Sequence, residues 1–136
     1  EYFNNLFQHH FPGEDGSVRE KIEKVNELIN KHEQEIANPL LKYINSRDDI
    51  KLIGKNKIEN KNRAPTIAFT MNNKSSKELS SDLVKQGIAT RNDNFYAWRC
   101  LKALGIDVDD GVVRTSMVHY NTHEDVNNLI EALKKI

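Results

Sequence analysis

The sequence contains little of several features that would assign it to a specific class of protein. Its 136 residues include one cysteine, three prolines and six glycines, and twenty acidic residues balance twenty basic ones. A single cysteine excludes an internal disulfide and a thiolate metal cluster, and it fits a reducing cytoplasm. Without net charge, no overall field attracts nucleic acid or an anionic membrane. No apolar run is long enough to cross a bilayer. Together, these features lead us to expect a cytoplasmic protein that binds neither membrane nor nucleic acid.

The length and the remaining composition fit one folded domain. The sequence is 38% hydrophobic and 29% charged, which is polar for a globular protein but short of the composition of a disordered chain. One local excess of positive charge is "KLIGKNKIENKNR", at 51–63. This stretch has no aromatic residue on which a base could stack, so we expect a solvated connection. A nucleic-acid binder acting through it stays an alternative, which retention on heparin would test.

The first part of the chain predicts a surface segment followed by a long helix. Residues 1–16 show no clear periodicity, and the adjacent His9 and His10 point apart on a helix or strand, so no metal site is expected there. "SVRE", at 17–20, is a capping box that begins a helix. An apolar stripe at helical spacing follows: Val18, Ile22, Val25, Ile29, His32 and Ile36. At Pro39 either this helix kinks, or Asn38 caps a second helix.

The rest of the chain alternates strands and helices. We expect strands at 49–54, 64–70, 88–91 and 111–120, and helices at 75–87, within 92–105 and from 122 onward. Ser75 and Glu78 form a second capping box, and Thr122 caps the last helix. This order predicts an α/β (α+β) fold, a two-layer sandwich in which helices cover one side of a small, mainly antiparallel sheet.

Patterns for catalysis by this chain alone are missing from the sequence. No glycine-rich loop precedes a helix, and neither HExxH nor CxxC spacing occurs. Cys100, on the helix after Trp98, is expected to be a small buried apolar residue rather than a nucleophile. His32 lies in line with the apolar stripe of the long helix, where we expect a hydrogen-bonded histidine at a helix interface.

Arg114 lies in the middle of the best strand candidate. Because strand residues alternate between faces, Val112, Arg114 and Ser116 share one side of the sheet. One interpretation is an ordinary arginine on the solvated face of an edge strand. The other is an arginine fixed on rigid backbone, where it binds a carboxylate through two parallel hydrogen bonds. The pattern alone does not decide between them.

The C-terminal end carries a motif that resembles a known family. "RTSMVHYNTHEDV", at 114–126, has the form R-x-S-x-x-x-Y-N-T-x-E-x-V and leads into a terminal amphipathic helix. It resembles the end of class V aminotransferase-like enzymes, pyridoxal-phosphate proteins of fold type I that include cysteine desulfurases and selenocysteine lyases. "RAPTIAFT" is similar to the first strand of the family's small domain. "ELSSDLVKQGIATRNDNFYA" is similar to its helix, strand and active-site loop.

The resemblance implies roles for the chain and for several of its residues. Residues 1–16 would lead in from a large domain, 17–47 would form a connecting helix, and 48–136 would be the small domain that closes over pyridoxal 5'-phosphate. Arg114 would bind the α-carboxylate of an amino-acid substrate, and Arg91 would lie at the mouth of the active site. The partners of the intact enzyme would be that substrate, its own large domain and a second copy in a homodimer. A structural role, turning the chain and capping the last helix, is implied for Tyr120, Asn121 and Thr122.

Two departures from the family pattern restrict what this chain can do. The Schiff-base lysine and the phosphate-binding residues belong to the large domain, so we expect this chain alone to be inactive and to bind no cofactor. The desulfurase cysteine would lie in the loop formed by Asn94, Phe95 and Tyr96, where Tyr96 or a neighbour takes its place. Cys100 follows a helical turn later, outside near-attack geometry. A true desulfurase or selenocysteine lyase using Cys100, and a standalone non-catalytic α/β binding module, stay as alternatives.

Overall fold

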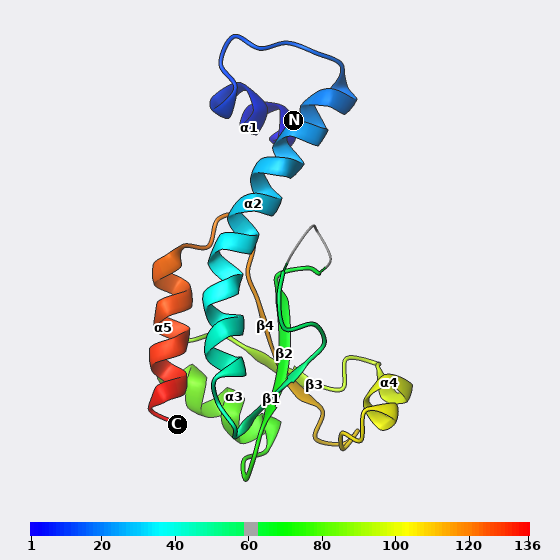
Figure 1. Ribbon diagram of the computed structural model, residues 1–136, viewed down its shortest axis with the longest axis vertical. Coiled ribbons are helices and arrows are strands. Elements are labelled where there is room, and N and C mark those ends of the chain that lie inside the picture. Colours follow the sequence, from blue (N-terminus) through cyan, green and yellow to red (C-terminus); the bar gives the residue numbers. More distant parts are fainter. Residues whose placement is uncertain (59–62) are drawn as a thin grey trace.

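The computed structural model describes residues 1–58 and 63–136 and is an α/β fold (Figure 1). Within these ranges it contains five helices and four strands. In chain order they are α1 (Tyr2–His10), α2 (Val18–Asn45), β1 (Ile50–Ile53), β2 (Thr66–Met71), α3 (Ser76–Lys85), β3 (Arg91–Asp93), α4 (Trp98–Ala103), β4 (Val112–Ser116) and α5 (His123–Lys134). A small antiparallel sheet with helices packed on it confirms the predicted fold class.

The sheet has the strand order β1-β2-β4-β3, and each neighbouring pair is antiparallel. Ile67 and Phe69 of β2 and Val113 of β4 are fully buried on one face. There they join the buried sides of α2, α3 and α5 in one core. Figure 1 shows α4 set apart from these three helices, beyond β3. The other face of the sheet is therefore free of α2, α3 and α5, and we call it the open face.

α2 runs without a break through Pro39, so the interpretation of a second helix capped by Asn38 is wrong. The Asn38 side chain instead accepts a hydrogen bond from the backbone N–H of Ile58, at 3.3 Å. A proline inside a helix costs about 3 kcal/mol. The two residues after it, Leu40 and Leu41, are at most 1% exposed, and burial of each contributes about 1.5–3 kcal/mol. Packing on the sheet is therefore sufficient to keep α2 continuous.

The segment before α2 contains a helix, α1, which the sequence pattern did not reveal. Its Phe7 is 2% exposed, and the ammonium of Lys21 in α2 lies 5.4 Å from the centre of that ring. Figure 1 shows α1 beside the start of α2, beyond the end of the sheet. Because the sheet does not reach this far, Val18 and Ile22 stay 76% and 38% exposed. The predicted apolar stripe therefore joins the core only in its later turns.

The third strand begins later than the sequence predicted. The prediction was 88–91, but the paired residues are Arg91–Asp93. Ile88 turns toward the core, and its backbone N–H donates to the Leu83 carbonyl at the end of α3, at 3.0 Å. That bond takes the N–H of Ile88 away from the sheet, so pairing starts only after the chain has left α3.

The last helix forms as predicted. The Thr122 hydroxyl accepts a hydrogen bond from the backbone N–H of Asp125, at 3.2 Å. Val126, Leu129 and Leu133 of α5 are buried against the sheet and α2. In the part of the chain that the structure describes, none of the helices has both the length and the apolar character needed to cross a membrane.

Candidate functional site

Two arginines lie side by side on the open face. Arg114 of β4 is directly opposite Arg91 of β3, and its other neighbour in the same row is Ala68 of β2. Residues paired in this way point to the same face. Since Val113, the next residue of β4, is fully buried in the core, Arg114 and Arg91 face away from α2, α3 and α5. β4 is an interior strand, so the interpretation of Arg114 as an edge-strand arginine is wrong.

The guanidinium groups of this pair have no anionic partner among the residues that the structure describes. The nearby carboxylate of Asp93 accepts a hydrogen bond from the backbone N–H of Asn94, at 2.7 Å. Arg114 instead contacts the ring of Phe95, whose centre lies 4.0 Å from the guanidinium carbon. Two cations that have no anionic partner among the described residues can together attract an anion, and a planar guanidinium suits a carboxylate.

The loop predicted at the active site is a tight turn beside this pair. The backbone N–H of Ala97 donates to the Asn94 carbonyl at 2.8 Å, and the Asn94 side chain donates to the Val108 carbonyl at 3.2 Å. Both central residues have left-handed backbones, with φ of 51° at Phe95 and 59° at Tyr96. Each such residue costs of order 1–3 kcal/mol when it is not glycine. Tyr96 is 99% exposed, whereas Phe95 turns toward Arg114.

Asp110 and Gly111, which directly precede β4, position this turn. Sequence reasoning missed the role of both residues. Asp110 accepts two hydrogen bonds from the backbone N–H of Ser76, the first residue of α3, at 2.8 and 3.1 Å. Gly111 has φ of +75°, and a Cβ there would lie 2.3 Å from the backbone carbonyl of Asp93 and 2.7 Å from the amide of Asn94. The Asp-Gly dipeptide before a strand was the available signal. These contacts attach the start of β4 to α3 and to the end of β3.

Cys100 is exposed, which corrects the prediction of a buried apolar residue. It lies in α4, as expected, but this helix has only six residues and buries one of them, Leu101. A helix with a single buried position leaves its other faces in solvent. The Cys100 thiol therefore belongs to the outside of α4, and Tyr96 stands at the exposed tip of the turn.

Asn121 and Thr122, which follow β4, have structural contacts of the kind that the resemblance implied. The Asn121 side chain accepts from the backbone N–H of Val118, at 2.9 Å. Its backbone carbonyl accepts from Nε2 of His32, at 2.8 Å, so His32 is the hydrogen-bonded interface histidine that we expected. Hydrogen bonds from Thr122 and Asn121 lower the pKa of the Asp125 carboxyl. Tyr120 is 76% exposed, with its ring edge against His119.

The described residues contain no candidate metal centre. Nowhere in the described ranges do three or more His, Cys, Asp or Glu side chains gather in a group that could hold a metal ion. His9 and His10 are exposed on α1, but their rings do not point apart as predicted: they meet edge to face, with centres 4.8 Å apart. Burial raises the pKa of Glu33, while the nearby His119 and His32 oppose that shift. The Tyr2 hydroxyl bonds to Nε2 of His119, which attaches α1 to the segment after β4.

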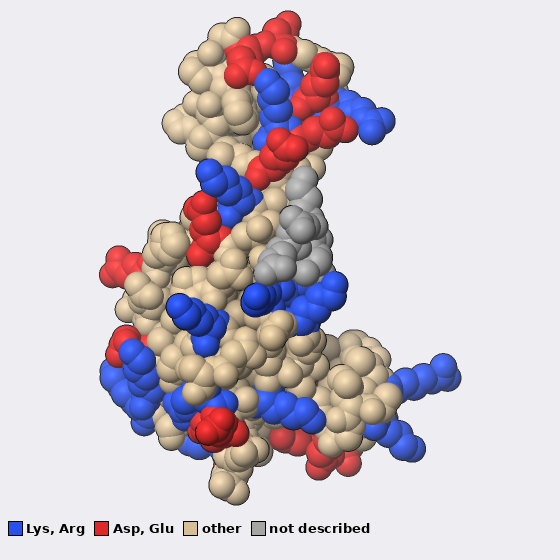
Figure 2. Space-filling view, viewed as in Figure 1, with Lys and Arg blue, Asp and Glu red and all other residues tan. Residues whose placement is uncertain are grey.

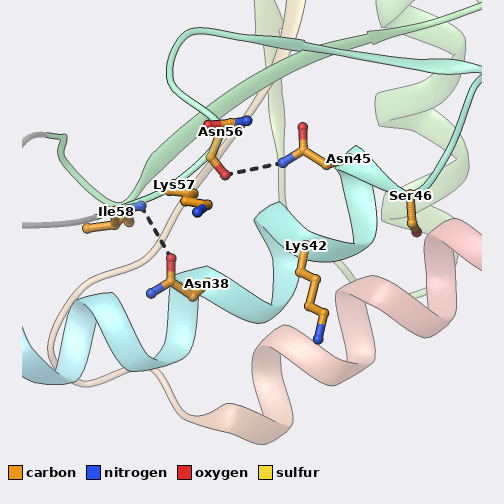
Figure 3. A pocket seen from close by; sticks show the side chains of 7 residues that line it. All are labelled: Asn38, Lys42, Asn45, Ser46, Asn56, Lys57 and Ile58. Atoms are coloured by element: carbon orange, nitrogen blue, oxygen red, sulfur yellow. Dashed lines mark hydrogen bonds between the residues drawn. The ribbon is translucent and has the colours of Figure 1, made fainter.

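A hollow of about 720 Å³, lined mostly by residues of polar type, lies between the end of α2 and the segment after β1. Figure 3 shows Asn38 and Asn45 of α2 directed at this segment. Asn45 donates to the Asn56 carbonyl at 3.2 Å, and Asn38 accepts from the N–H of Ile58. Ile58 is itself buried in the core. Because these amide groups hold the chain's own backbone, we interpret the hollow as a structural junction rather than a binding site.

Charges of both signs are spread over the face of the molecule drawn in Figure 2. Figure 2 shows acidic and basic side chains interleaved over the start of α2 and the segment before it, and basic ones next to the residues that are not described. Of the basic stretch 51–63, residues 59–62 lie outside the described residues. The Arg63 guanidinium donates to the carbonyls of Lys55 and Thr66. In the described part of this stretch, Arg63 thus binds the chain's own backbone.

Comparison with known proteins finds similarity to class V aminotransferases and cysteine desulfurases. The family model for class V aminotransferases matches residues 20–129. An aminotransferase-like protein of Gibberella zeae is 35% identical over 112 residues, which cover 81% of this chain and 28% of that protein. A cysteine desulfurase of Escherichia coli is 29% identical over 108 residues, covering 79% of this chain and 25% of that protein. The apo structure of a cysteine desulfurase from Thermococcus onnurineus superposes with a TM-score of 0.70 at 20% identity, over 85% of this chain and 28% of that one.

Each of these matches covers only part of a longer protein. The chain spans about a quarter of the length of the curated relatives it matches. At 20% identity, the solved structure shows a shared fold and nothing further. The family model, in contrast, covers most of the chain, including both arginines of the open face. This chain therefore belongs to the class V aminotransferase family.

Proposed function

We propose that this chain is the carboxylate-binding small domain of a class V aminotransferase-like enzyme, and that it is inactive alone. The observation that carries the proposal is Arg114, an arginine on an interior strand whose guanidinium has no anionic partner among the described residues. Strand backbone fixes its position, and its planar donors match the two oxygens of an amino-acid carboxylate. Arg91, directly opposite, would add positive charge at the mouth of the same site.

Enzymes of this family depend on pyridoxal 5'-phosphate, but the open face of this chain does not itself fit that cofactor. It presents two guanidiniums and an aromatic ring, and the ammonium of Lys51, which alternation places on this face, donates to the Leu104 carbonyl at 3.4 Å. Such a face suits a small anion, whereas the cofactor needs a lysine for covalent attachment and a holder for its phosphate. We therefore assign the cofactor to a large domain, and to this chain the binding and orientation of the substrate.

In the predicted active-site loop of Asn94, Phe95 and Tyr96, the ring of Phe95 would form the wall of the site next to Arg114, while the side chain of Tyr96 points into solvent and lies outside that wall. The family resemblance gives Tyr96 or a neighbouring residue the place where desulfurases carry their cysteine, so we propose a reaction at Cα or Cβ of an amino acid that needs no thiol here, such as β-elimination, racemisation or transamination. In the intact, cytoplasmic enzyme the open face would meet its own large domain. A homodimer would form mainly through that large domain.

The test uses the intact enzyme that carries this chain, with its cofactor absorbance as a reporter. Arg114→Ala is expected to weaken amino-acid binding strongly while the spectrum of the resting cofactor stays unchanged, because the arginine holds the carboxylate and not the cofactor. Arg114→Lys should rescue binding only in part, since a lysine cannot bind two oxygens in parallel. Unchanged substrate affinity in the alanine variant would show that Arg114 is not the carboxylate-binding residue.

A second candidate is a true cysteine desulfurase or selenocysteine lyase that uses Cys100. The exposed thiol favours it, as does the similarity to a cysteine desulfurase. Its position in α4, beyond the turn, opposes it. Incubation of the intact enzyme with cysteine, followed by persulfide trapping, tests this candidate. A persulfide on Cys100, together with loss of activity in Cys100→Ala, would establish it in place of a thiol-independent reaction.

The size of the native protein separates both enzymes from a standalone binding module. An immunoblot of source cells with an antibody against this domain would give that size directly. A band several times heavier than this chain would support a domain of a larger enzyme. A band at 15.7 kDa would mean that the chain acts without a large domain, and the catalytic role proposed for Arg114 would then be wrong.

A further inference from the structure

The turn beside Arg114 has a backbone that its sequence does not favour. Both central residues, Phe95 and Tyr96, have positive φ, and the hydrogen bond from Ala97 to Asn94 closes the turn. This geometry matches the type I′ class, in which asparagine and glycine are preferred at the central positions. Two adjacent aromatic residues are among the least suitable. Something in the surrounding structure must therefore hold this turn.

The contact between Phe95 and Arg114 gives this strained turn a role. The guanidinium carbon lies 4.0 Å from the ring centre, which places the cation against the face of the ring. All five N–H donors of a guanidinium lie in its plane. Contact with a ring face therefore restrains the arginine without using its in-plane donors, which have no anionic partner among the described residues. An ion pair would restrain it too, but would occupy those donors.

We infer that Phe95 is the positioning residue for Arg114. The left-handed backbone at Phe95 turns its ring onto the guanidinium, and the ring holds that group with its N–H donors free for a carboxylate. The turn thereby removes much of the freedom that the long arginine side chain would otherwise lose on binding. This inference deepens the proposed function and rests on it, because it assigns to Phe95 an action on the carboxylate that occurs through Arg114.

Tyr96 provides a matched control within the same turn. Its backbone φ of 59° is close to the 51° of Phe95, but its side chain is 99% exposed. Truncating Tyr96 therefore changes the same strained turn without removing a ring from Arg114. A difference between the variants that remove the ring at 95 and at 96 separates the contact with the guanidinium from a general effect on the loop.

The first measurement is the NMR signal of the Arg114 Nε–Hε group in this chain. The ring current of Phe95 is expected to shift this proton upfield of the corresponding signals of the other arginines. Phe95→Leu should abolish the shift, while Phe95→Tyr and Tyr96→Ala should keep it. Unchanged dispersion of the backbone amide signals would show that the leucine variant is folded. An Arg114 signal without an upfield shift in the unaltered chain would overturn the inference at once.

The second measurement is the response of the same signal to sodium acetate, with sodium chloride at equal ionic strength as the reference. Loss of preorganisation in Phe95→Leu should weaken the apparent acetate affinity roughly two- to tenfold. Phe95→Tyr should restore the affinity, and Tyr96→Ala should leave it unchanged.

The outcomes distinguish the positioning role of Phe95 from the proposed carboxylate site at Arg114, on which that role rests. If acetate moves the Arg114 signal equally in the unaltered chain and in Phe95→Leu, the proposed carboxylate site stands and the positioning role of Phe95 is wrong. A tyrosine variant as weak as the leucine variant would also overturn that role, because the ring is retained. If acetate has no effect on Arg114 in any variant, the proposed function fails, and the inference fails with it.

Discussion

Replacement of Gly111 by alanine tests the close approach that sets the turn against β4. Gly111 has φ of +75°, and an added Cβ would lie 2.3 Å from the backbone carbonyl of Asp93 and 2.7 Å from the amide of Asn94. These atoms are backbone, so no side chain can rotate away to make room. The end of β3 would have to move from β4, or Gly111 would have to change its own conformation.

The expected cost has two parts that a second glycine separates. An alanine in a left-handed conformation costs about 1–2 kcal/mol, and the steric conflict adds about 1–3 kcal/mol, as overpacking does in protein cores. Gly105 also has positive φ, +68°, but a Cβ added there would have nothing within 4 Å. Gly105→Ala should therefore show the first part alone. Gly111→Ala should show both, about 2–5 kcal/mol.

Urea unfolding followed by circular dichroism measures both variants. With an m value of about 2 kcal/mol/M, the midpoint should fall by about 1–2.5 M for Gly111→Ala and by about 0.5–1 M for Gly105→Ala. The Arg114 Nε–Hε signal should also lose part of its upfield shift in Gly111→Ala only, because Phe95 follows directly on the displaced segment. Equal midpoints for the two variants would refute the argument that backbone contact constrains Gly111.

Three further outcomes are expected. Asp110→Ala should destabilise the chain by about 1–3 kcal/mol in urea unfolding, because it leaves the N–H of Ser76 at the start of α3 unbonded; Asp110→Asn, which keeps an acceptor, should cost less. Hydrogen bonds from Lys74 and Lys85 lower the pKa of Asp82 to about 2. The Asp82 carboxylate therefore stabilises the fold when the pH is above the ordinary pKa of an aspartate, and this stabilisation is lost as the pH falls toward 2. Between pH 5 and pH 2, the melting temperature of Asp82→Asn should fall less steeply than that of the unaltered chain. Cys100 should react with a thiol reagent in the folded chain, and reaction only after unfolding would contradict its exposed position.

The sequence predicted those parts of the fold that depend on local pattern. The capping boxes that begin α2 and α3 formed as their spacing required. Alternation placed Arg114 on the face opposite Val113, as the structure confirms. Such features depend only on residues that are close in the sequence. A capping box needs two residues three positions apart, and the face of a strand residue follows from alternation along the strand.

Other features depended on contacts that no local pattern contains. The strand order places Arg114 on an interior strand, and the pairing of β3 with β4 brings Arg91 opposite it. The turn at Phe95 contradicts the residue preferences of its own class, so sequence rules would not place it there. α1 was missed because it buries little more than Phe7, against α2 and not in the main core. The exposed Cys100 was missed because α4 packs through a single residue.

The arrangement of the two arginines has an energetic meaning beyond their identity. Like charges directly opposite in neighbouring strands destabilise the pair, by about 0.2–1 kcal/mol relative to neutral residues. Arg91 and Arg114 hold this position without an anionic partner among the described residues. A fold shaped only by stability would gain from a neutral or acidic residue at either place. A bound carboxylate removes the repulsion, so the same pair that weakens the free sheet strengthens the complex. Packing alone does not explain this cost, whereas the proposed carboxylate ligand of the open face would.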